Sequence, residues 1–349
     1  MNIYFRASAN FLLYKYIILQ SGLMTVIIYK KTRRIMTLCL AWRNGNAAYL
    51  ASDSRLTDAE KKVTSDEATK IFKIGVEVYA PTPHDDPYKE PQLLHRTNYG
   101  LCFAGSYLNG SILADTIGEV LSNIQAVPDQ SDISIENLSN IAFGVYEQVS
   151  RPLMSIHNEC GLSSVFFGGY CLETAVFKLY KFYAFQDAPG QPVYFKKDEM
   201  VLTNTPIYLG DSNAIIKAEE LIALKKPGYT HFHLLREIIK DSEIATVGGK
   251  MQFGEFKWNT FKTNGIVEYS LEPDESGIKQ VIGHFNYRGL SLDLNDKALR
   301  SGHINIMKTF FDPFESERRE LFKETKKSIE EQQDKWEAAI RKKAEKGDW

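Results

Sequence analysis

Three polar residues in the first third of the chain have the types and the spacing of an activated nucleophile. Thr37 opens an apolar run, Asp53 follows sixteen residues later, and Lys70 lies seventeen residues beyond Asp53. A threonine hydroxyl is a weak nucleophile until a base removes its proton and a nearby cation favours the alkoxide. If the chain begins at Thr37, its own α-amino group, with an unperturbed pKa of about 8, can be that base near neutral pH. The three residues therefore predict an N-terminal threonine nucleophile.

Each of these residues also has an ordinary structural explanation when it is taken alone. A β-branched threonine suits a strand, an aspartate suits a turn, and a lysine suits a solvated strand edge. Gly105, a fourth candidate, is equally typical of a tight turn. The order and spacing of the set, and no single member, favour the catalytic interpretation.

Five segments that contain or follow these residues resemble one family. They are Thr37-Leu-Cys-Leu-Ala-Trp42, Leu50-Ala-Ser-Asp-Ser-Arg55, Lys70-Ile-Phe-Lys-Ile74, Phe103-Ala-Gly-Ser106, and Phe167-Gly-Gly-Tyr170 before a strand-like run. In this order they are similar to the proteasome β-subunit family of N-terminal nucleophile hydrolases, including its bacterial ancestral-β-subunit (Anbu) type. The resemblance covers roughly residues 37–255 and fades afterwards.

The resemblance implies a role for each matched residue. Thr37 would be the nucleophile, Asp53 would orient Lys70, Lys70 would lower the pKa of the hydroxyl, and the Gly105 amide would receive the oxyanion. The implied activity is a threonine-type peptidase or amidohydrolase that acts on a peptide or protein substrate. No metal and no organic cofactor is implied.

The second half of the chain departs from the family pattern. Where the family has Gly-Ser-Gly before a helix, this chain has Gly210-Asp211-Ser212, so either Asp211 or Ser212 is the candidate that supports the amino group. A carboxylate close to a cationic amine would raise the pKa of that amine and make it a poorer base. The later Asp-x-x-Ser-Gly-Gly pattern is matched only out of register, which leaves Thr246 as a supporting candidate.

The 36 residues before Thr37 are the main obstacle to this chemistry, because an N-terminal nucleophile cannot work while they are attached. They are explained either as a propeptide that is clipped between Met36 and Thr37, or as an upstream extension of a chain whose true start is Met36. The second explanation is favoured, because an initiator methionine before a small threonine is the sequence that methionine aminopeptidase trims. The expected mature chain is residues 37–349.

The same leader contains an apolar stretch at residues 11–29. It is long enough for a bilayer span, which needs about 20 mainly apolar residues, but Lys15, Gln20 and Ser21 interrupt it. A basic run follows the apolar stretch, whereas a signal peptide has its basic region first. We therefore expect no association with a membrane.

Composition sets the broad class of the protein. The chain has 349 residues, of which 44% are hydrophobic and 25% charged, as is ordinary for a soluble globular protein. A net charge of −2 provides no bulk attraction to nucleic acid or to acidic membranes. Four cysteines without zinc-site or disulfide-framework spacing fit a reducing compartment, so we expect a cytoplasmic protein. No Gly-x-Ser-x-Gly elbow and no Walker or Rossmann glycine motif is present.

The elements that must position these residues alternate between strands and pairs of helices. Helices are expected at 109–124, 135–157, 212–225 and 231–242, the last beginning at His231-Phe-His233, which we interpret as a helix start and not as a metal site. Strands are expected within 37–75, around a turn at Asn44-Gly45, and at 100–104, 162–168, 175–184, 193–209, 265–271 and 279–287. The proline-rich segment 80–98 is expected to be a loop that forms a rim over the site or contacts a neighbouring subunit. This order suits an α+β fold, a four-layer αββα sandwich, which the family resemblance favours.

The expected organisation has three parts: a leader at 1–36, the nucleophile hydrolase domain at 37–308, and a charged C-terminal helix at 309–349. Phe322, Ile329 and Trp336 recur every seven residues in that helix, which indicates docking on a neighbouring subunit or packing on its own domain. The resemblance implies a homo-oligomeric ring, with an ATP-dependent unfoldase as a candidate partner. Two alternatives remain: a small-molecule amidase on the same fold, and a non-catalytic proteasome-like scaffold with an inert site.

Overall fold

The computed structural model describes eleven stretches of the chain. These are residues 15–20, 23–28, 37–58, 60–81, 90–127, 132–171, 173–187, 191–224, 227–257, 259–291 and 310–346, with backbone alone at 15–20, 23–28 and 343–346. Helices and sheets alternate along these stretches, so the prediction of a mixed α+β chain is confirmed. None of the described helices is both long and apolar enough to cross a membrane.

Six strands form the first sheet, in the spatial order β12-β11-β10-β8-β7-β9. Their bounds are β7 (Ile71–Tyr79), β8 (Leu93–Gly105), β9 (Ile124–Gln125), β10 (Ser163–Cys171), β11 (Val176–Phe185) and β12 (Tyr194–Met200). All neighbours are antiparallel except β7 and β9, which are parallel.

Strand β8 corrects the expectation of a loop over residues 80–98. The strand begins at Leu93, and its first half pairs with β7, with Val78 opposite His95 and Val76 opposite Thr97. The local sequence has little strand character, and the ladder to β7 supplies the partners that its backbone groups need. Residues 82–89 of the expected loop lie outside the described residues.

The second sheet has the order β13-β3-β4-β14-β15-β16, and β17 pairs with β15. Its strands are β3 (Leu38–Asn44), β4 (Ala47–Ser52), β13 (Ile207–Gly210), β14 (Gln252–Lys257), β15 (Thr260–Pro273), β16 (Lys279–Tyr287) and β17 (Phe310–Phe311). The expected strand at 193–209 is divided between β12 in one sheet and β13 in the other, and β14 was not predicted. Two small hairpins complete the strands: β1 (Lys15–Gln20) with β2 (Leu23–Ile28), and β5 (Leu56–Thr57) with β6 (Val63–Ser65).

Five α-helices are described, four of them close to their predicted ranges. They are α1 (Tyr107–Leu121), α2 (Ile135–His157), α3 (Ser212–Ala223), α4 (His231–Lys240) and α5 (Glu315–Lys346), and a short 3₁₀ turn, η1 (Asn158–Gly161), follows α2. Ser106, Ser134, Asp211 and Thr230 cap the first four through their side-chain oxygens. The His233 side chain completes a capping box with Thr230, so the interpretation of the His231-Phe-His233 segment as a helix start is confirmed.

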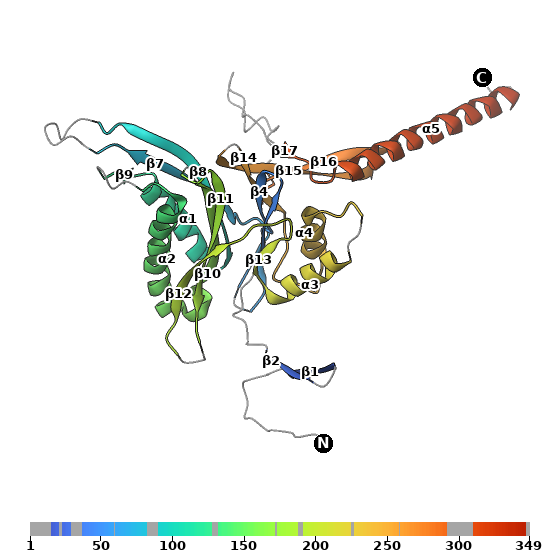
Figure 1. Cartoon of the computed structure of the whole chain (residues 1–349). Coiled ribbons are helices and arrows are strands. Elements are labelled where there is room, and N and C mark those ends of the chain that lie inside the picture. The colour runs from blue at the N-terminus through green and yellow to red at the C-terminus, as the bar shows by residue number, and fades with distance from the viewer. Residues whose placement is uncertain are drawn as a thin grey trace.

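The side chains of β3 alternate between two hydrophobic cores, one on each face of the second sheet. Leu38 and Leu40 point into a core shared with α3 and α4, whereas Cys39 and Ala41 point into a core shared with the first sheet. Successive side chains of a strand face opposite sides, so one strand serves both cores. A third core joins α1 and α2 to the outer face of the first sheet. Figure 1 shows these two helix pairs on opposite sides of the strands.

The C-terminal helix α5 extends away from the body of the molecule (Figure 1, red). Among its contacts with the second sheet region, Ser328 Oγ accepts from the Lys279 N–H at 3.2 Å, Gln332 Nε2 donates to the Ser276 carbonyl at 3.4 Å, and the Arg318 guanidinium lies over the Tyr269 ring. The predicted apolar stripe stays exposed, with Trp336 69% accessible. The stripe therefore does not pack on its own domain, and docking on a neighbour stays a prediction.

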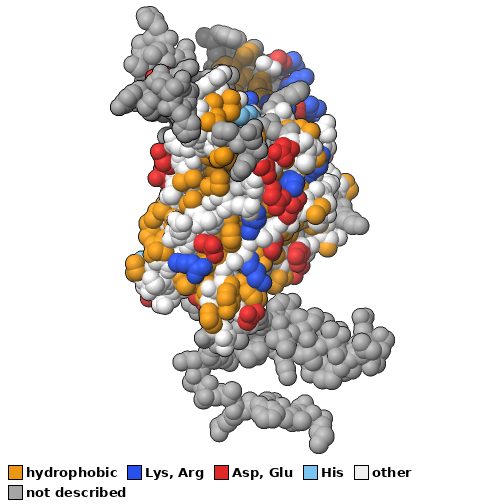
Figure 2. Space-filling view, turned by 60° about the vertical axis from the view of Figure 1, so that its left-hand side comes forward, with side chains coloured by type: hydrophobic (Ala, Val, Ile, Leu, Met, Phe, Trp, Pro, Cys, Tyr) orange, Lys and Arg blue, Asp and Glu red, His pale blue; other side chains and the backbone are white. Residues whose placement is uncertain are grey.

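The surface drawn in Figure 2 carries acidic and basic side chains interspersed among apolar ones, with no extended patch of a single sign. This mixture agrees with the small net charge of the chain, −2. Long-range steering of a highly charged partner would need a large field of one sign, which this face does not present.

The core between the two sheets makes a testable prediction. Phe166 is fully buried there, so Phe166→Ala is expected to lower the free energy of unfolding by about 3–5 kcal/mol, through lost burial and the cavity left behind. Urea denaturation followed by circular dichroism measures the change. Ile156→Ala on α2, where the side chain is 68% exposed, is the control and should stay within about 0.5 kcal/mol. Equal losses for the two variants would contradict the assignment of this core.

Candidate active site

The β3–β4 hairpin places Thr37 and Asp53 at the same end of the second sheet. Cys39 is paired with Ser52, so the next residues outward, Leu38 and Asp53, face each other, and the Leu38 N–H donates to Asp53 Oδ1 at 3.1 Å. The turn at the other end contains Gly45 with φ +58°, as the Asn-Gly signal predicted. Turn length sets the register of a hairpin, and here it aligns the carboxylate with the residue that follows the nucleophile.

Lys70 enters this site from the other sheet, because it directly precedes β7. Its Nζ donates to Thr37 Oγ1 at 2.6 Å, to Asp53 Oδ1 at 3.0 Å and to the Arg55 carbonyl at 2.6 Å. An ammonium group has three N–H donors, and each of them has an acceptor. Lys70 is fully buried, so the solvated strand-edge explanation for this lysine is wrong.

The Asp53 carboxylate is held at both oxygens. Oδ1 accepts from Leu38 N and Lys70 Nζ, and Oδ2 accepts from the backbone N–H groups of Arg55 and Gly248, both at 3.1 Å. Three of the four donors belong to the backbone, which cannot rotate away as a side chain can. The position of the Lys70 ammonium is therefore determined by main-chain geometry.

Gln252, at the start of β14, braces this arrangement and was missed by the sequence analysis. Its Oε1 accepts from the Lys70 N–H at 2.9 Å, and its Nε2 donates to the carbonyls of Asp53 at 3.0 Å and Ala68 at 2.6 Å. The side chain is 1% exposed. A single glutamine has no motif around it, so no sequence signal could have identified this role.

The backbone at Thr37 is strained and closely packed. Its φ is +105°, a region in which a β-branched residue is a genuine outlier. The Thr37 carbonyl accepts from the Asp211 N–H at 2.8 Å. Gly210, with φ +135°, leaves no room for a side chain, since a Cβ there would lie 1.8 Å from the Thr37 oxygen. Strain of this kind persists only where the surrounding structure enforces it, and it is concentrated at functional sites.

Asp211 is brought to Thr37 through its backbone, and its carboxylate has other partners. Oδ1 caps α3 by accepting from Asn213 N at 2.8 Å, and Oδ2 accepts from Thr246 Oγ1 at 2.9 Å. Thr246, the weakest of the sequence candidates, is buried, with 3% of its surface exposed. It adjoins the site through this bond to Asp211. Ser212, the other candidate at this position, is the first residue of α3.

Gly105 and Thr37 line one small pocket of about 180 Å³, with Arg55, Leu56, Thr57, Thr64 and Tyr107 as the other lining residues. Gly105 has φ +117°, and a Cβ at this position would lie 2.6 Å from the Leu162 carbonyl oxygen. Only glycine fits this backbone. The predicted oxyanion residue and the predicted nucleophile therefore line the same pocket.

Arg55 and Asp66 form an ion pair at the edge of this pocket. Arg55 Nε and Nη2 donate to the two Asp66 carboxylate oxygens at 2.7 and 3.1 Å. The hydrogen bond from Arg55 lowers the pKa of Asp66, and the same bond raises the pKa of Arg55. Two parallel bonds fix the guanidinium in one plane, which makes it a rigid wall of the pocket.

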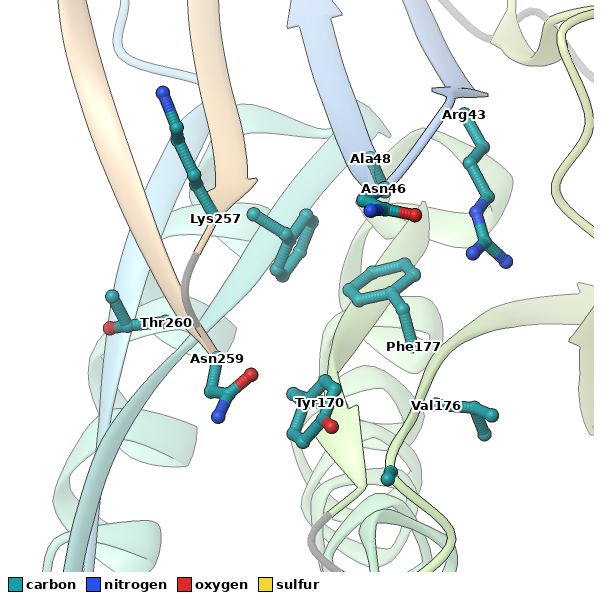
Figure 3. A pocket seen from close by; sticks show the side chains of 11 residues that line it. Arg43, Asn46, Ala48, Tyr170, Val176, Phe177, Lys257, Asn259 and Thr260 are labelled. Carbon is teal, nitrogen blue, oxygen red and sulfur yellow. The ribbon is translucent and has the colours of Figure 1, made fainter.

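A larger pocket of about 320 Å³ lies at the far end of β3, among the β3–β4, β10–β11 and β14–β15 turns (Figure 3). Phe177 and Phe256 meet there with ring centroids 4.1 Å apart, and Asn46 and Asn259 lie on either side of them. Its described lining residues include no carboxylate, histidine, serine or cysteine. The residues predicted to carry the chemistry therefore lie at the Thr37 end of β3 and not here.

No group of three or more histidine, cysteine, aspartate or glutamate side chains within the described part of the chain is arranged to hold a metal ion. Cys39, Cys102 and Cys171 are buried, as predicted from their apolar runs, and Cys160 is exposed.

Comparisons with known proteins add two structural neighbours. No family model matches the sequence, and no curated protein matches it. Anbu (ancestral beta-subunit) from Yersinia bercovieri is similar with a TM-score of 0.43 and 12% sequence identity, over 65% of this chain and 86% of that one. The Gly-1 mutant of Anbu from Hyphomicrobium sp. strain MC1 is similar with a TM-score of 0.42 and 13% identity, over the same shares. Both are of the type that the sequence motifs resemble, but TM-scores this low carry no argument about function.

The second prediction concerns the buried ion pair between Lys70 and Asp53. Asp53→Asn keeps the shape of the side chain but leaves the Lys70 charge buried without a counter-charge, so it should lower the free energy of unfolding by about 3–5 kcal/mol. The double variant Asp53→Asn/Lys70→Met should lose less than the sum of the two single variants, as urea unfolding at pH 7 would show. Lys323→Met, which breaks the exposed Lys323–Glu320 pair, is the control and should change stability little. Additive losses would show that the two charges are not coupled.

The Arg55–Asp66 pair makes the third prediction. The pKa of Asp66 is lowered from an ordinary value of 3.8, so the stability that the pair contributes is present above that value and is lost as pH falls through the lowered pKa. The melting temperature of Asp66→Asn should therefore lie below that of the parent at neutral pH, and the difference should disappear in acid. Exposed Asp115→Asn serves as the control. A difference that is unchanged down to pH 2 would contradict the ionic origin of the contact.

Proposed function

We propose that this chain is an N-terminal threonine hydrolase that cleaves amide bonds, most simply those of peptides. The observation that carries the proposal is the 2.6 Å contact between Lys70 Nζ and Thr37 Oγ1, inside a buried polar cluster. A cation that donates to a hydroxyl favours its alkoxide form, and the effect grows in a low-dielectric site. A threonine that served only as a strand residue would need no buried ammonium against its oxygen.

The proposed reaction assigns one step to each of these groups. Thr37 Oγ1 attacks the substrate carbonyl carbon while the α-amino group of Thr37 takes the hydroxyl proton. The carbonyl oxygen becomes an oxyanion that the Gly105 N–H receives. The α-ammonium then gives its proton to the leaving amine, the C–N bond breaks, and an ester to Thr37 remains. Water, activated by the same amine, attacks the ester and releases the carboxylic acid and the free hydroxyl.

The strain at Thr37 supports a mature chain that begins at this residue. The angle φ is defined by the peptide bond to residue 36, so the unfavourable value of +105° exists only while that bond is intact. Removal of the leader would relieve the strain and at the same time create the amine that the reaction needs. Both explanations of the leader, autolysis and an upstream extension, lead to this same terminus.

Asp211 is inferred to be a positioning residue. Its N–H holds the Thr37 carbonyl, while its carboxylate is engaged by the N-terminus of α3 and by Thr246. A helix N-terminus favours a negative charge, so the carboxylate is already compensated there.

The pocket between Thr37 and Gly105 favours a peptide over a small amide. Its volume of about 180 Å³ is below the ~300–1,000 Å³ that encloses a whole small ligand. A space of that size fits one side chain of a longer substrate whose backbone lies outside. The lining by Leu56, Thr57 and Tyr107 suits an uncharged side chain.

We further infer the layered architecture and the organisation that accompany this function. The three cores support a four-layer αββα sandwich for residues 37–308, with residues 309–349 as a separate helical extension. The exposed stripe on α5 is proposed to dock on a neighbouring copy of the chain in a homo-oligomeric ring. An unfoldase is the candidate partner of this ring, and the cytoplasm is its proposed location.

The double variant Ile329→Glu/Trp336→Glu should then reduce the assembly mass measured by light scattering.

A further prediction tests the nucleophile. A chain that begins at Thr37 should hydrolyse peptide amides, and Thr37→Ala should lower the rate by at least about a thousandfold, because the attacking atom is absent. Lys70→Met should also be strongly impaired, whereas Thr203→Ala, in an exposed loop, should be unaffected. A fluorogenic peptide library measures the rates, and intact mass identifies the N-terminal residue of each sample.

Two results would contradict the proposal. One is hydrolysis that is unchanged in Thr37→Ala. The other is native protein that retains residues upstream of Thr37 and is inactive, which would favour the non-catalytic scaffold.

A further inference from the structure

A second pocket, of about 290 Å³, adjoins the candidate active site through Arg55, which lines both. It lies among α4, the segment at Gly249–Met251 and the strands β15 and β16. The residues assigned to the hydrolytic reaction, Thr37, Lys70 and Gly105, do not line it. Its function must therefore be inferred from its own side chains.

Most charged side chains around this pocket are already paired. Arg236 makes a two-bond contact with Glu317, Lys250 lies 3.4 Å from Glu67, and Arg55 is bound to Asp66. These pairs build the wall of the pocket and leave little net charge on it.

Two opposite charges in the same pocket have no such partner. Lys240, at the end of α4, and Glu268, on β15, both line the pocket, and within the described part of the chain neither forms an ion pair, with each other or with any other residue. An isolated cation and an isolated anion on the walls of one cavity are complementary to a ligand that carries both charges.

A third group in the pocket is a buried acceptor atom without a partner among the described residues. Asn286, on β16, is 7% exposed, and its Oδ1 accepts no hydrogen bond from the described residues. Leaving a buried acceptor unsatisfied costs about 1–3 kcal/mol, so such an atom is expected where a ligand supplies the donor. Asn286 is opposite Ile266, two residues from Glu268, so the side chains of Asn286 and Glu268 lie on the same face of the β15–β16 pair.

We propose that this pocket binds a free amino acid or a dipeptide by both of its charged ends. The α-ammonium would bind Glu268 and Asn286 Oδ1, and the α-carboxylate would bind Lys240. A volume of about 290 Å³ is just below the ~300 Å³ at which small-ligand sites begin, which suits a ligand no larger than a dipeptide. The inference does not require hydrolysis, but under the proposed function such molecules are the products.

Isothermal titration calorimetry on the full chain carrying Thr37→Ala tests the proposal without any turnover of the probe. The probe is alanyl-alanine, compared with its C-terminal amide and its N-acetyl form. The unmodified dipeptide should bind with one site per chain, and each modified form should bind at least tenfold more weakly, because one charged end is missing.

Variants locate the binding. Lys240→Met and Glu268→Gln should each weaken binding at least tenfold, while Lys262→Met, an exposed lysine on β15 outside the pocket, should leave it unchanged. Melting curves confirm that each variant is folded. The proposal is overturned if no heat is observed, if the amide and the acetylated peptide bind as well as the parent dipeptide, or if the pocket variants bind normally. Full displacement by inorganic phosphate would show a simple anion site and would also overturn it.

Discussion

The buried contact of Lys70 with Asp53 and Thr37 is the interaction on which the rest of the structure depends. Two charges without access to water are tolerated only when every donor and acceptor has a partner, because desolvation otherwise exceeds the attraction between them. Here the Arg55 carbonyl accepts from the Lys70 ammonium, and the backbone N–H groups of Arg55 and Gly248 donate to the Asp53 carboxylate. Segments distant in sequence must therefore meet at one point, and that condition determines how the two sheets are aligned.

The alignment also explains why the site is rigid. Lys70 directly precedes β7 of the first sheet and Asp53 directly follows β4 of the second, so the ion pair joins the two sheets beside the core that contains Cys39 and Cys102. Each sheet is backed by two helices whose apolar faces it buries. Movement of either sheet would break hydrogen bonds in a place where water cannot replace them. The site is therefore as rigid as the core around it.

Two glycines and one threonine at the candidate active site have backbone angles that are unusual for residues other than glycine. Gly210 and Gly105 have positive φ values and lie where a side chain would collide with main-chain oxygen atoms. Thr37 has a positive φ without being glycine, which costs energy that the surrounding contacts must offset. Around this point the chain also forms two pockets that share Arg55, one toward the nucleophile and one toward α4.

Local sequence determined much of this protein. Apolar periodicity located α1 to α4 within a few residues, the Asn44-Gly45 signal located a hairpin turn, and the ordered trio Thr37, Asp53 and Lys70 identified residues that the structure brings into contact. These features depend on neighbours along the chain, such as side chains at helical spacing and turn residues with special backbone angles, and a single sequence displays them.

Tertiary structure decided the rest. The pairing of Leu93–Asn98 with β7, the bracing by Gln252 and the place of Asp211 against Thr37 all depend on partners tens or hundreds of residues away. The same is true of Lys240, Glu268 and Asn286, which meet in one pocket only because helix and sheet pack together, and no pattern within the chain marks them beforehand.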